Sequence, residues 1–206
     1  SLLANCVSPK TTSKGIYMGG FAAPKIPNLR AAFIGVGAQG GNHLRVVASM
    51  ENTEVVAISD LYEDHVERWS QIASDIGKGE RHQNVVTYYG DENLWKKMLD
   101  DVKPDVVFIN TNWENHAPMV IQAMKSGAHA FVEVPIATTL EDMWEIVRMS
   151  EETQKHCMMM ENVNYSRDEL MFLNMCRKGV IGELLHAEAA YIHELRSQMQ
   201  EQDREE

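Results

Sequence analysis

The 206-residue chain has no apolar run approaching the roughly 20 residues that a helix needs to cross a bilayer. The sequence therefore predicts no membrane-spanning segment. It also has only three cysteines, Cys6, Cys157 and Cys176, and none of them is spaced as C-x-x-C. Three cysteines cannot all pair with one another, so the pattern argues against a disulfide framework and a zinc site. No metal is expected.

Positive charge is also scarce. The chain has 19 lysines and arginines against 30 acidic residues, which gives a formal net charge of −11. No basic stripe is present to neutralise phosphates, so nucleic acid is not an expected partner. The hydrophobic content of 44% and the charged content of 24% are typical of a globular protein that buries a core.

What the chain does contain is a glycine-rich turn. A short apolar run at residues 31–34 is followed by three glycines with the spacing G-x-G-x-x-G. Gly35 permits a tight turn, Gly37 lets the backbone approach a pyrophosphate, and Gly40 lets a helix pack closely on the strand. A helix that opens near Gln39 offers unpaired N–H groups and the positive end of its dipole to phosphates. The pattern indicates a dinucleotide-binding turn.

An acidic residue follows at the expected distance. Asp60 ends a second apolar strand at residues 54–59, twenty positions after Gly40. A carboxylate at this place accepts hydrogen bonds from an adenosine ribose and repels a 2′-phosphate. The sequence therefore predicts NAD as the cofactor and disfavours NADP. A coincidental glycine-rich turn is the alternative.

Short apolar strands alternate with helical patterns from Arg30 onward. Thr138 and Glu141 resemble a capping box that opens the last helix of this series. The alternation predicts an α/β fold, a doubly wound parallel (Rossmann) sheet with right-handed crossovers. The expected strands are 31–35, 54–59, 85–89, 105–110 and 128–134, and the expected helices are 40–50, 62–76, 91–100, 114–126 and 139–155.

Three parts are expected along the chain. Residues 1–29 form an irregular N-terminal arm, residues 30–156 an NAD-binding Rossmann domain, and residues 157–206 the incomplete beginning of a C-terminal substrate domain. The last part is expected to be α+β, with strands at 157–165 and 183–193 around a helix at 167–178. One helix and two strands cannot cover both faces of a sheet. We therefore expect the front half of a longer protein, or a chain completed by a partner.

Two further segments lie where this fold binds ligands, outside the C-terminal ends of the strands. Residues 110–116, which include Trp113 and His116, follow the fourth strand, and Glu133-Val-Pro135 follows the fifth. We expect these residues to face the nicotinamide half of a dinucleotide. The alternatives are a helix-start cap with a packed aromatic ring for the first segment and a buried carboxylate that holds the next loop for the second.

The glycine turn, the Trp113–His116 turn, a strand ending in Glu-x-Pro and a following second domain resemble the glucose–fructose oxidoreductase/inositol dehydrogenase (Gfo/Idh/MocA) family of NAD(P)-dependent sugar oxidoreductases. Ordinary members carry Glu-Lys-Pro, and the resemblance implies that this lysine assists proton transfer. Here Val134 occupies the lysine position, and valine cannot donate or accept a proton. A conventional NAD-dependent sugar oxidoreductase is therefore an alternative, and a non-catalytic dinucleotide-binding module is another.

A more specific resemblance is to glycoside hydrolase family 109, NAD-dependent α-N-acetylgalactosaminidases that also carry Glu-Val-Pro. It runs from about residue 20 to residue 195 and is strongest at residues 155–162, 173–175, 179–188 and 190–194. It implies a hydrolase, a glycosidase of carbohydrate metabolism in which the sugar is transiently oxidised at C3, deprotonated at C2 and eliminated. The groups that transfer protons are expected downstream of Glu206, so it stays open whether these 206 residues are active alone.

The motif and the resemblance together predict the site residues. Tyr191 is expected to contact the sugar, and His193, two residues along the same strand face, is either a second substrate contact or structural. His43 is expected to face solvent or to cap a helix. The predicted NAD contacts are Gly35, Gly37, Ala38, Gln39, Gly40, Asp60, Trp113, Glu114, Asn115, His116, Glu133, Val134 and Asn162.

The expected partner is a small sugar or glycoside, and a homo-oligomer is left open. Members of the resembling family often carry export signals, which favours a periplasmic or exported protein; a cytoplasmic one is the alternative.

Overall fold

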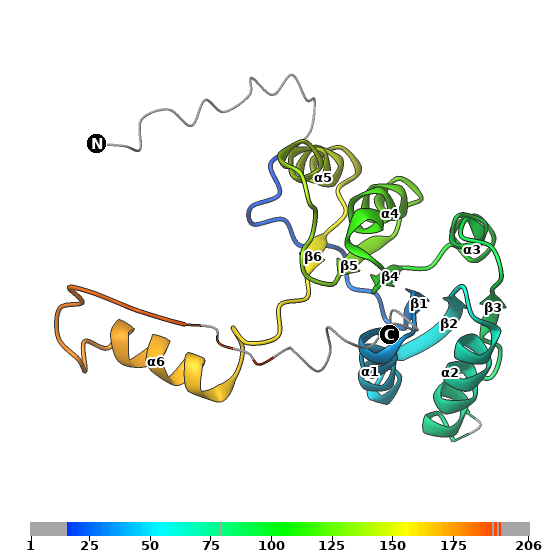
Figure 1. Cartoon of the computed structure of the whole chain (residues 1–206), viewed down its shortest axis with the longest axis horizontal. Helices are drawn as coiled ribbons and strands as arrows, with labels where there is room; N and C mark the ends of the chain where they lie inside the picture. The colour runs from blue at the N-terminus through cyan, green and yellow to red at the C-terminus, as the bar shows by residue number, and fades with distance from the viewer. Residues whose placement is uncertain (1–15, 79, 191, 193, 195–206) are drawn as a thin grey trace. The chain divides into compact units, whose positions relative to one another are not determined.

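The computed structural model describes residues 16–78, 80–190, 192 and 194 (Figure 1). The chain divides into two compact units, one ending at Met160 and the other beginning at Glu161, and each is described by itself. No described helix is both long enough and apolar enough to cross a membrane.

The first unit is built on one sheet of six parallel strands in the order β3-β2-β1-β4-β5-β6. The predicted doubly wound Rossmann fold is confirmed. The strands are β1 (Leu29–Ile34), β2 (Thr53–Ser59), β3 (Val86–Tyr88), β4 (Val106–Ile109), β5 (His129–Val132) and β6 (Cys157–Met159), and the helices are α1 (Ala38–Ser49), α2 (Glu63–Ile76), α3 (Leu94–Val102), α4 (Trp113–Lys125) and α5 (Leu140–Thr153).

Helices cover both faces of the sheet because successive strand residues point to opposite sides. In β1, Ala31 and Phe33 pack with α1 and α2, whereas Ala32 and Ile34 pack with α3, α4 and α5. On the first of these faces, Phe33 stacks on the ring of Phe108 with the ring centroids 4.8 Å apart. Strands buried on both faces explain why their sequences read as unbroken apolar runs.

Local signals end and begin the helices. Gly127 follows α4 with a φ of +94°, as expected of a glycine after a helix C-terminus. The capping box of α5, by contrast, was predicted one residue too early. The hydroxyl of Thr139, not Thr138, accepts a hydrogen bond from the backbone N–H of Asp142 and donates one to its carboxylate. Thr139 lies next to the helix, so it is the residue whose side chain reaches the free N–H groups.

The strand predicted at 157–165 as the start of a second domain is corrected by the sheet. Only Cys157–Met159 is extended, and it pairs in parallel with β5 as the sixth strand of the first unit. The extended segment stops because Glu161 turns the chain: its carboxylate accepts hydrogen bonds from the backbone N–H groups of Val163 and Asn164. The first compact unit therefore extends to Met160.

The second unit contains α6 (Arg167–Arg177), as predicted, and none of its residues is buried. The strand predicted at 183–193 is not found among the described residues of that range. Alternating polarity produces a strand only where a neighbouring strand accepts and donates the backbone hydrogen bonds. No strand of the second unit is described that could do so.

Residues 16–28, the described part of the N-terminal arm before β1, have neither helix nor strand; Leu29, the last residue of the predicted arm, already belongs to β1. The arm contacts the C-terminal end of α5. The N–H of Ile16 donates to the carbonyl of Glu151, and the side-chain amide of Gln154 donates to the carbonyl of Ile16. The ring of Phe21 lies 5.1 Å from that of His156. The arm is thus attached at the β6 edge of the sheet.

Candidate functional site

One row of residues marks the C-terminal edge of the sheet. Gly35, Asp60, Asn110, Glu133 and Met160 each come directly after a strand. The backbone N–H of each donates a hydrogen bond of 2.8–3.0 Å to a carbonyl of a neighbouring strand segment. The parallel register therefore continues one step beyond the strands and aligns residues that are far apart in the sequence.

The glycine turn has the geometry that its sequence predicts. Gly35 has a φ of +81°, a conformation that L side chains rarely adopt. A Cβ on Gly40 would collide with the carbonyl of Gly35, so glycine is required for α1 to start this close to β1. Ala38 and Gln39, in the first turn of α1, are exposed, and no side chain among the described residues caps this helix start. Its N–H groups are therefore oriented as an anion site needs them.

Asp60 is joined to this turn. Its Oδ2 accepts a 2.8 Å hydrogen bond from the N–H of Val36, and its Oδ1 accepts one of 3.0 Å from the N–H of Tyr62. Nδ1 of His65 lies 3.3 Å from the same Oδ1, and the Asp60 side chain is only 8% exposed. The carboxylate is fixed in place, and each oxygen retains capacity for a further hydrogen bond from a ribose hydroxyl.

Asn110 supplies an independent test of whether the site fits a dinucleotide. Its side-chain Oδ1 is buried and has no hydrogen-bond partner in the described structure. A buried acceptor without a partner is uncommon and calls for a donor. Asn110 follows β4 beside the glycine turn, since its backbone N–H donates to Ile34 and a Cβ on Gly35 would collide with its carbonyl. Together with the uncapped helix start and Asp60, this acceptor fits a bound dinucleotide.

His116, in the first turn of α4, connects two loops at this edge of the sheet. Its ring is fully buried, with Nδ1 2.7 Å from the carbonyl oxygen of Pro135 and Nε2 2.8 Å from that of Thr111. A carbonyl oxygen can only accept, so a ring nitrogen of His116 bonds to it as an N–H donor. His116 thus joins the turn after β4 to the loop after β5, and its contact with NAD stays a prediction.

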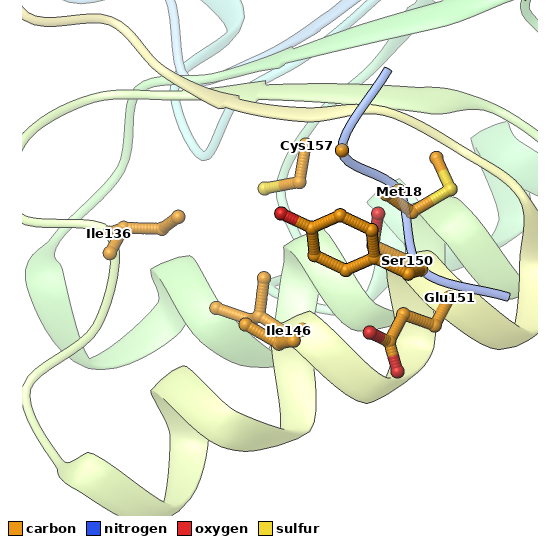
Figure 2. A pocket seen from close by; sticks show the side chains of 9 residues that line it. Met18, Ile136, Ile146, Ser150, Glu151 and Cys157 are labelled. Carbon is orange, nitrogen blue, oxygen red and sulfur yellow. The ribbon is translucent and has the colours of Figure 1, made fainter. Parts of the chain in front are cut away.

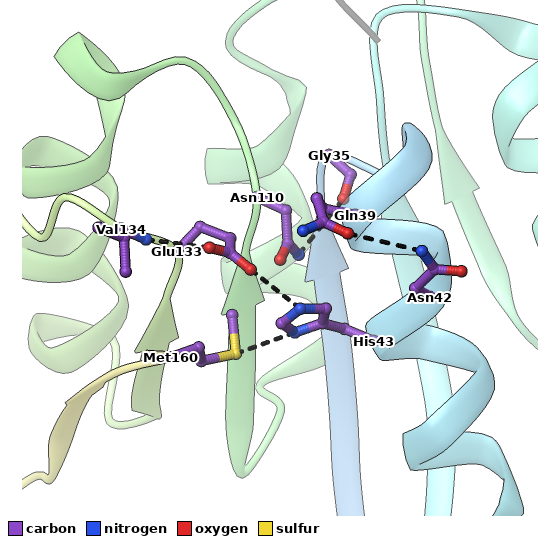
Figure 3. A network of polar contacts seen from close by, with 8 residues as sticks. All are labelled: Gly35, Gln39, Asn42, His43, Asn110, Glu133, Val134 and Met160. Atoms are coloured by element: carbon purple, nitrogen blue, oxygen red, sulfur yellow. Dashed lines mark hydrogen bonds and ion pairs between the residues drawn. The ribbon is translucent and has the colours of Figure 1, made fainter. Parts of the chain in front are cut away.

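Glu133 is held at the end of β5 by a residue that sequence reasoning did not select. Oε1 of Glu133 lies 2.9 Å from Nε2 of His43, and Oε2 accepts a 3.1 Å hydrogen bond from the N–H of Val134 (Figure 3). The expectation that His43 faces solvent or caps a helix is wrong. His43 lies three positions after Gly40, which is about one turn further along α1. This spacing is the sequence signal that could have indicated the contact with Glu133.

The other predicted residues are distributed as follows. Trp113, Glu114 and Asn115 are exposed at the start of α4. Val134 is also exposed, and its peptide bond to Pro135 is cis. Asn162 is exposed in the second unit, and its contact with NAD stays a prediction. Tyr191 and His193 lie outside the described residues.

A small apolar pocket lies elsewhere. It has a volume of about 240 Å³ and is formed between the N-terminal arm, α5 and β6, with Met18, Ile146 and Cys157 in its wall (Figure 2). None of the predicted site residues that the structure describes lines it. Burial raises the pKa of the Cys157 thiol to about 12, so this thiol stays protonated and inert at neutral pH.

Two family models match the chain. The oxidoreductase family with an NAD-binding Rossmann fold matches residues 29–161, and the C-terminal domain of glycosyl hydrolase 109 matches residues 165–205. The first match covers almost the whole six-stranded unit.

Curated relatives are similar over nearly the entire chain. Glycosyl hydrolase family 109 protein 1 of Akkermansia muciniphila is 49% identical over 205 residues, which are 97% of this chain and 42% of that protein. An alpha-N-acetylgalactosaminidase of Shewanella oneidensis is 49% identical over 198 residues, which are 96% of this chain and 42% of that protein. The chain thus spans about two fifths of the length of these relatives.

Solved structures share the fold. Scyllo-inositol dehydrogenase from Lactobacillus casei, with bound NAD(H) and scyllo-inositol, superposes with a TM-score of 0.65 at 16% identity and covers 76% of this chain and 43% of that chain. Myo-inositol 2-dehydrogenase from Lactobacillus plantarum has a TM-score of 0.63 at 25% identity, with the same coverage of 76% and 43%. The predicted cofactor class is confirmed, since the first unit is an NAD-binding Rossmann domain.

Proposed function

Since the chain belongs to the oxidoreductase family with an NAD-binding Rossmann fold, we propose that the whole protein is an NAD-dependent glycosidase that acts on α-linked N-acetylgalactosamine. The observation that carries the proposal is the combination of this domain with a segment at residues 165–205 that matches the glycosyl hydrolase 109 C-terminal domain. The 49% identity with a relative named alpha-N-acetylgalactosaminidase supports the substrate.

The first unit supplies the cofactor half of the site. The backbone around Gly35, Gly37 and Gly40, with the exposed Ala38 and Gln39, would hold the pyrophosphate against the start of α1. Asp60 would hold the adenosine ribose. Across β1, the exposed residues Trp113, Glu114, Asn115 and Val134 and the carboxylate of Glu133 would border the nicotinamide half.

Bound NAD supplies a reversible hydride acceptor for C3 of the sugar, which permits proton removal at C2, elimination of the aglycone and addition of water before the hydride returns. The protein's contribution is to orient C3 and to exclude competing reactions. Val134 occupies the place of the lysine that transfers a proton in ordinary members of the family, and valine offers no proton. It therefore fits a protein whose contribution at this place is to orient the sugar. Tyr191 and His193 are proposed sugar contacts, and Asn162 a proposed NAD contact.

The test uses the whole protein with NAD and 4-nitrophenyl α-N-acetylgalactosaminide in D₂O. We expect release of nitrophenol, deuterium at C2 of the released sugar and no net accumulation of NADH. Hydrolysis without deuterium at C2 would leave a glycosidase of the ordinary two-carboxylate type and refute the oxidation–elimination route.

A conventional sugar oxidoreductase is the second candidate, because the inositol dehydrogenases share this fold. It predicts that NADH accumulates in proportion to the sugar consumed, with no nitrophenol released. A non-catalytic dinucleotide-binding module would bind NAD, and it would neither accumulate NADH nor release nitrophenol.

As a matched variant, Val134→Lys restores the lysine of ordinary members and is expected to retain NAD binding. Loss of binding would make this position sterically critical.

A further inference from the structure

His43 and Glu133 form a contact between segments ninety positions apart in the chain. Nε2 of His43 lies 2.9 Å from Oε1 of Glu133. A carboxylate can only accept, so Nε2 carries the proton in this bond. Charge-assisted bonds of this kind are about twice as strong as neutral ones. The Glu133 carboxylate also accepts a hydrogen bond from the N–H of Val134, so each of its two oxygens has a partner (Figure 3).

The same ring reaches a third element. Nδ1 of His43 lies 3.2 Å from the sulfur of Met160, the residue that follows β6. His43 lies on α1, the helix that begins at the glycine turn, and it contacts Glu133 after β5 and Met160 after β6 (Figure 3). The side chains of His43 and Glu133 are 25% and 20% exposed, so they border the open edge of the sheet and are not buried in the core.

The strand order places this contact in the cofactor site. A dinucleotide lies across the switch point of a doubly wound sheet, which is here between β1 and β4. Asp60, after β2, belongs to the adenosine end. Glu133, after β5, lies on the other side of β1 and belongs to the nicotinamide end.

We propose that His43 is a positioning residue that holds the Glu133 carboxylate at the nicotinamide end of the site, so that affinity for NAD⁺ depends on it and affinity for ADP-ribose does not. ADP-ribose has the adenosine and pyrophosphate groups of NAD and lacks the nicotinamide ring. The oxidised ring is cationic, so a fixed carboxylate also favours NAD⁺ over NADH. The inference rests on the cofactor-binding part of the proposed function and is independent of the glycosidase reaction.

Two substitutions of His43 separate positioning from a general structural role. His43→Gln places an amide N–H near the position of Nε2, where it can still donate to Glu133. His43→Asn places it near Nδ1, on the side of Met160. Calorimetric titration of the full chain is expected to show that His43→Asn weakens NAD⁺ binding about tenfold, the effect of one lost charge-assisted hydrogen bond. ADP-ribose binding is expected to change less than about twofold, and His43→Gln to recover most of the NAD⁺ affinity.

The exposed His186 provides the matched control, and His186→Asn is expected to leave both affinities unchanged. Equal losses of affinity for NAD⁺ and ADP-ribose in His43→Asn, or no loss for either, would overturn the proposal.

If His43→Asn does not fold, Glu133→Gln tests the same contact by changing the other residue of the pair. It is expected to weaken NAD⁺ binding more than NADH or ADP-ribose binding, and an equal effect on all three overturns the proposal. Absence of nitrophenol release from the whole protein would remove the glycosidase function and leave these results standing.

Discussion

The N–H of Val36 donates a 2.8 Å hydrogen bond to Oδ2 of Asp60, so the turn after β1 and the acid after β2 form one rigid piece. The bond orients the carboxylate that we propose as the ribose contact. It also means that removing Asp60 affects the glycine turn as well as the ribose contact.

Asp60→Ala is expected to weaken NAD binding by about tenfold or more and to reduce discrimination against NADP, because the hydrogen bonds of a charged acceptor and its repulsion of a 2′-phosphate are lost together. Titration with both cofactors measures the effect. Asp100→Ala, at an exposed position of α3, is the control and should change neither affinity. An unchanged NAD/NADP ratio in Asp60→Ala would remove this residue from the specificity role.

Gly40→Ala is expected to destabilise the fold by about 1–3 kcal/mol, because the added methyl group meets the carbonyl of Gly35 and α1 must shift away from β1. Urea unfolding gives the stability, and titration gives a parallel loss of NAD affinity. Asn42→Ala introduces alanine at an exposed position of the same helix and should change stability by less than about 0.5 kcal/mol. Wild-type stability in Gly40→Ala would contradict the close approach of helix and strand.

His116→Phe keeps a ring of similar size and removes both ring nitrogens. The carbonyls of Pro135 and Thr111 then lose their partner beside a fully buried side chain. The expected loss of unfolding free energy is about 1–3 kcal/mol for each carbonyl that stays unpaired. Urea denaturation measures it, with the exposed neighbour substitution Asn115→Ala as control. A variant as stable as the wild type would show that the two bonds contribute nothing.

The unfolding free energy should depend on pH through His129. Burial, followed by the positive charges of Lys155 and His156, lowers the pKa of His129 below its ordinary value of 6.5, and Asp105 partly opposes this. The unfolded chain therefore takes up this proton at a higher pH than the folded protein does. The contribution of His129 to stability is present above pH 6.5 and is lost as the pH falls towards the lowered folded pKa.

Replacing His129 separates this effect from the other titrating groups. In the folded protein Nδ1 of His129 accepts a 2.9 Å hydrogen bond from the N–H of His156. His129→Asn keeps an acceptor near that position and removes the titration. We expect urea unfolding between pH 7.5 and pH 5.5 to show a smaller loss of stability in His129→Asn than in the wild type. The exposed substitution His186→Asn should follow the wild type. Parallel curves for His129→Asn and the wild type would exclude His129 as the source.

Most of the fold and the geometry of the glycine turn beside Asp60 were predictable, since their signals are local. Apolar strands of a few residues, a glycine where φ is +81° and an acid directly after a strand follow from backbone sterics and side-chain chemistry within one βαβ unit. The predictions were wrong where a contact joins distant segments. His43 was expected to face solvent or to cap a helix, and the strand at residues 157–159 was assigned to a second domain, because neither a contact between distant segments nor strand pairing is visible in a short window.

The amino-acid sequence by itself determined the alternation of strands and helices, the glycine turn and the choice of Asp60, because each depends on neighbours a few positions away. The tertiary structure alone decided that His43 meets Glu133, that His116 lies between two carbonyl groups and that β6 completes the first sheet. The physical reason is that strand order and register, set by packing of the whole sheet, bring the ends of parallel strands to one edge regardless of their separation in the chain.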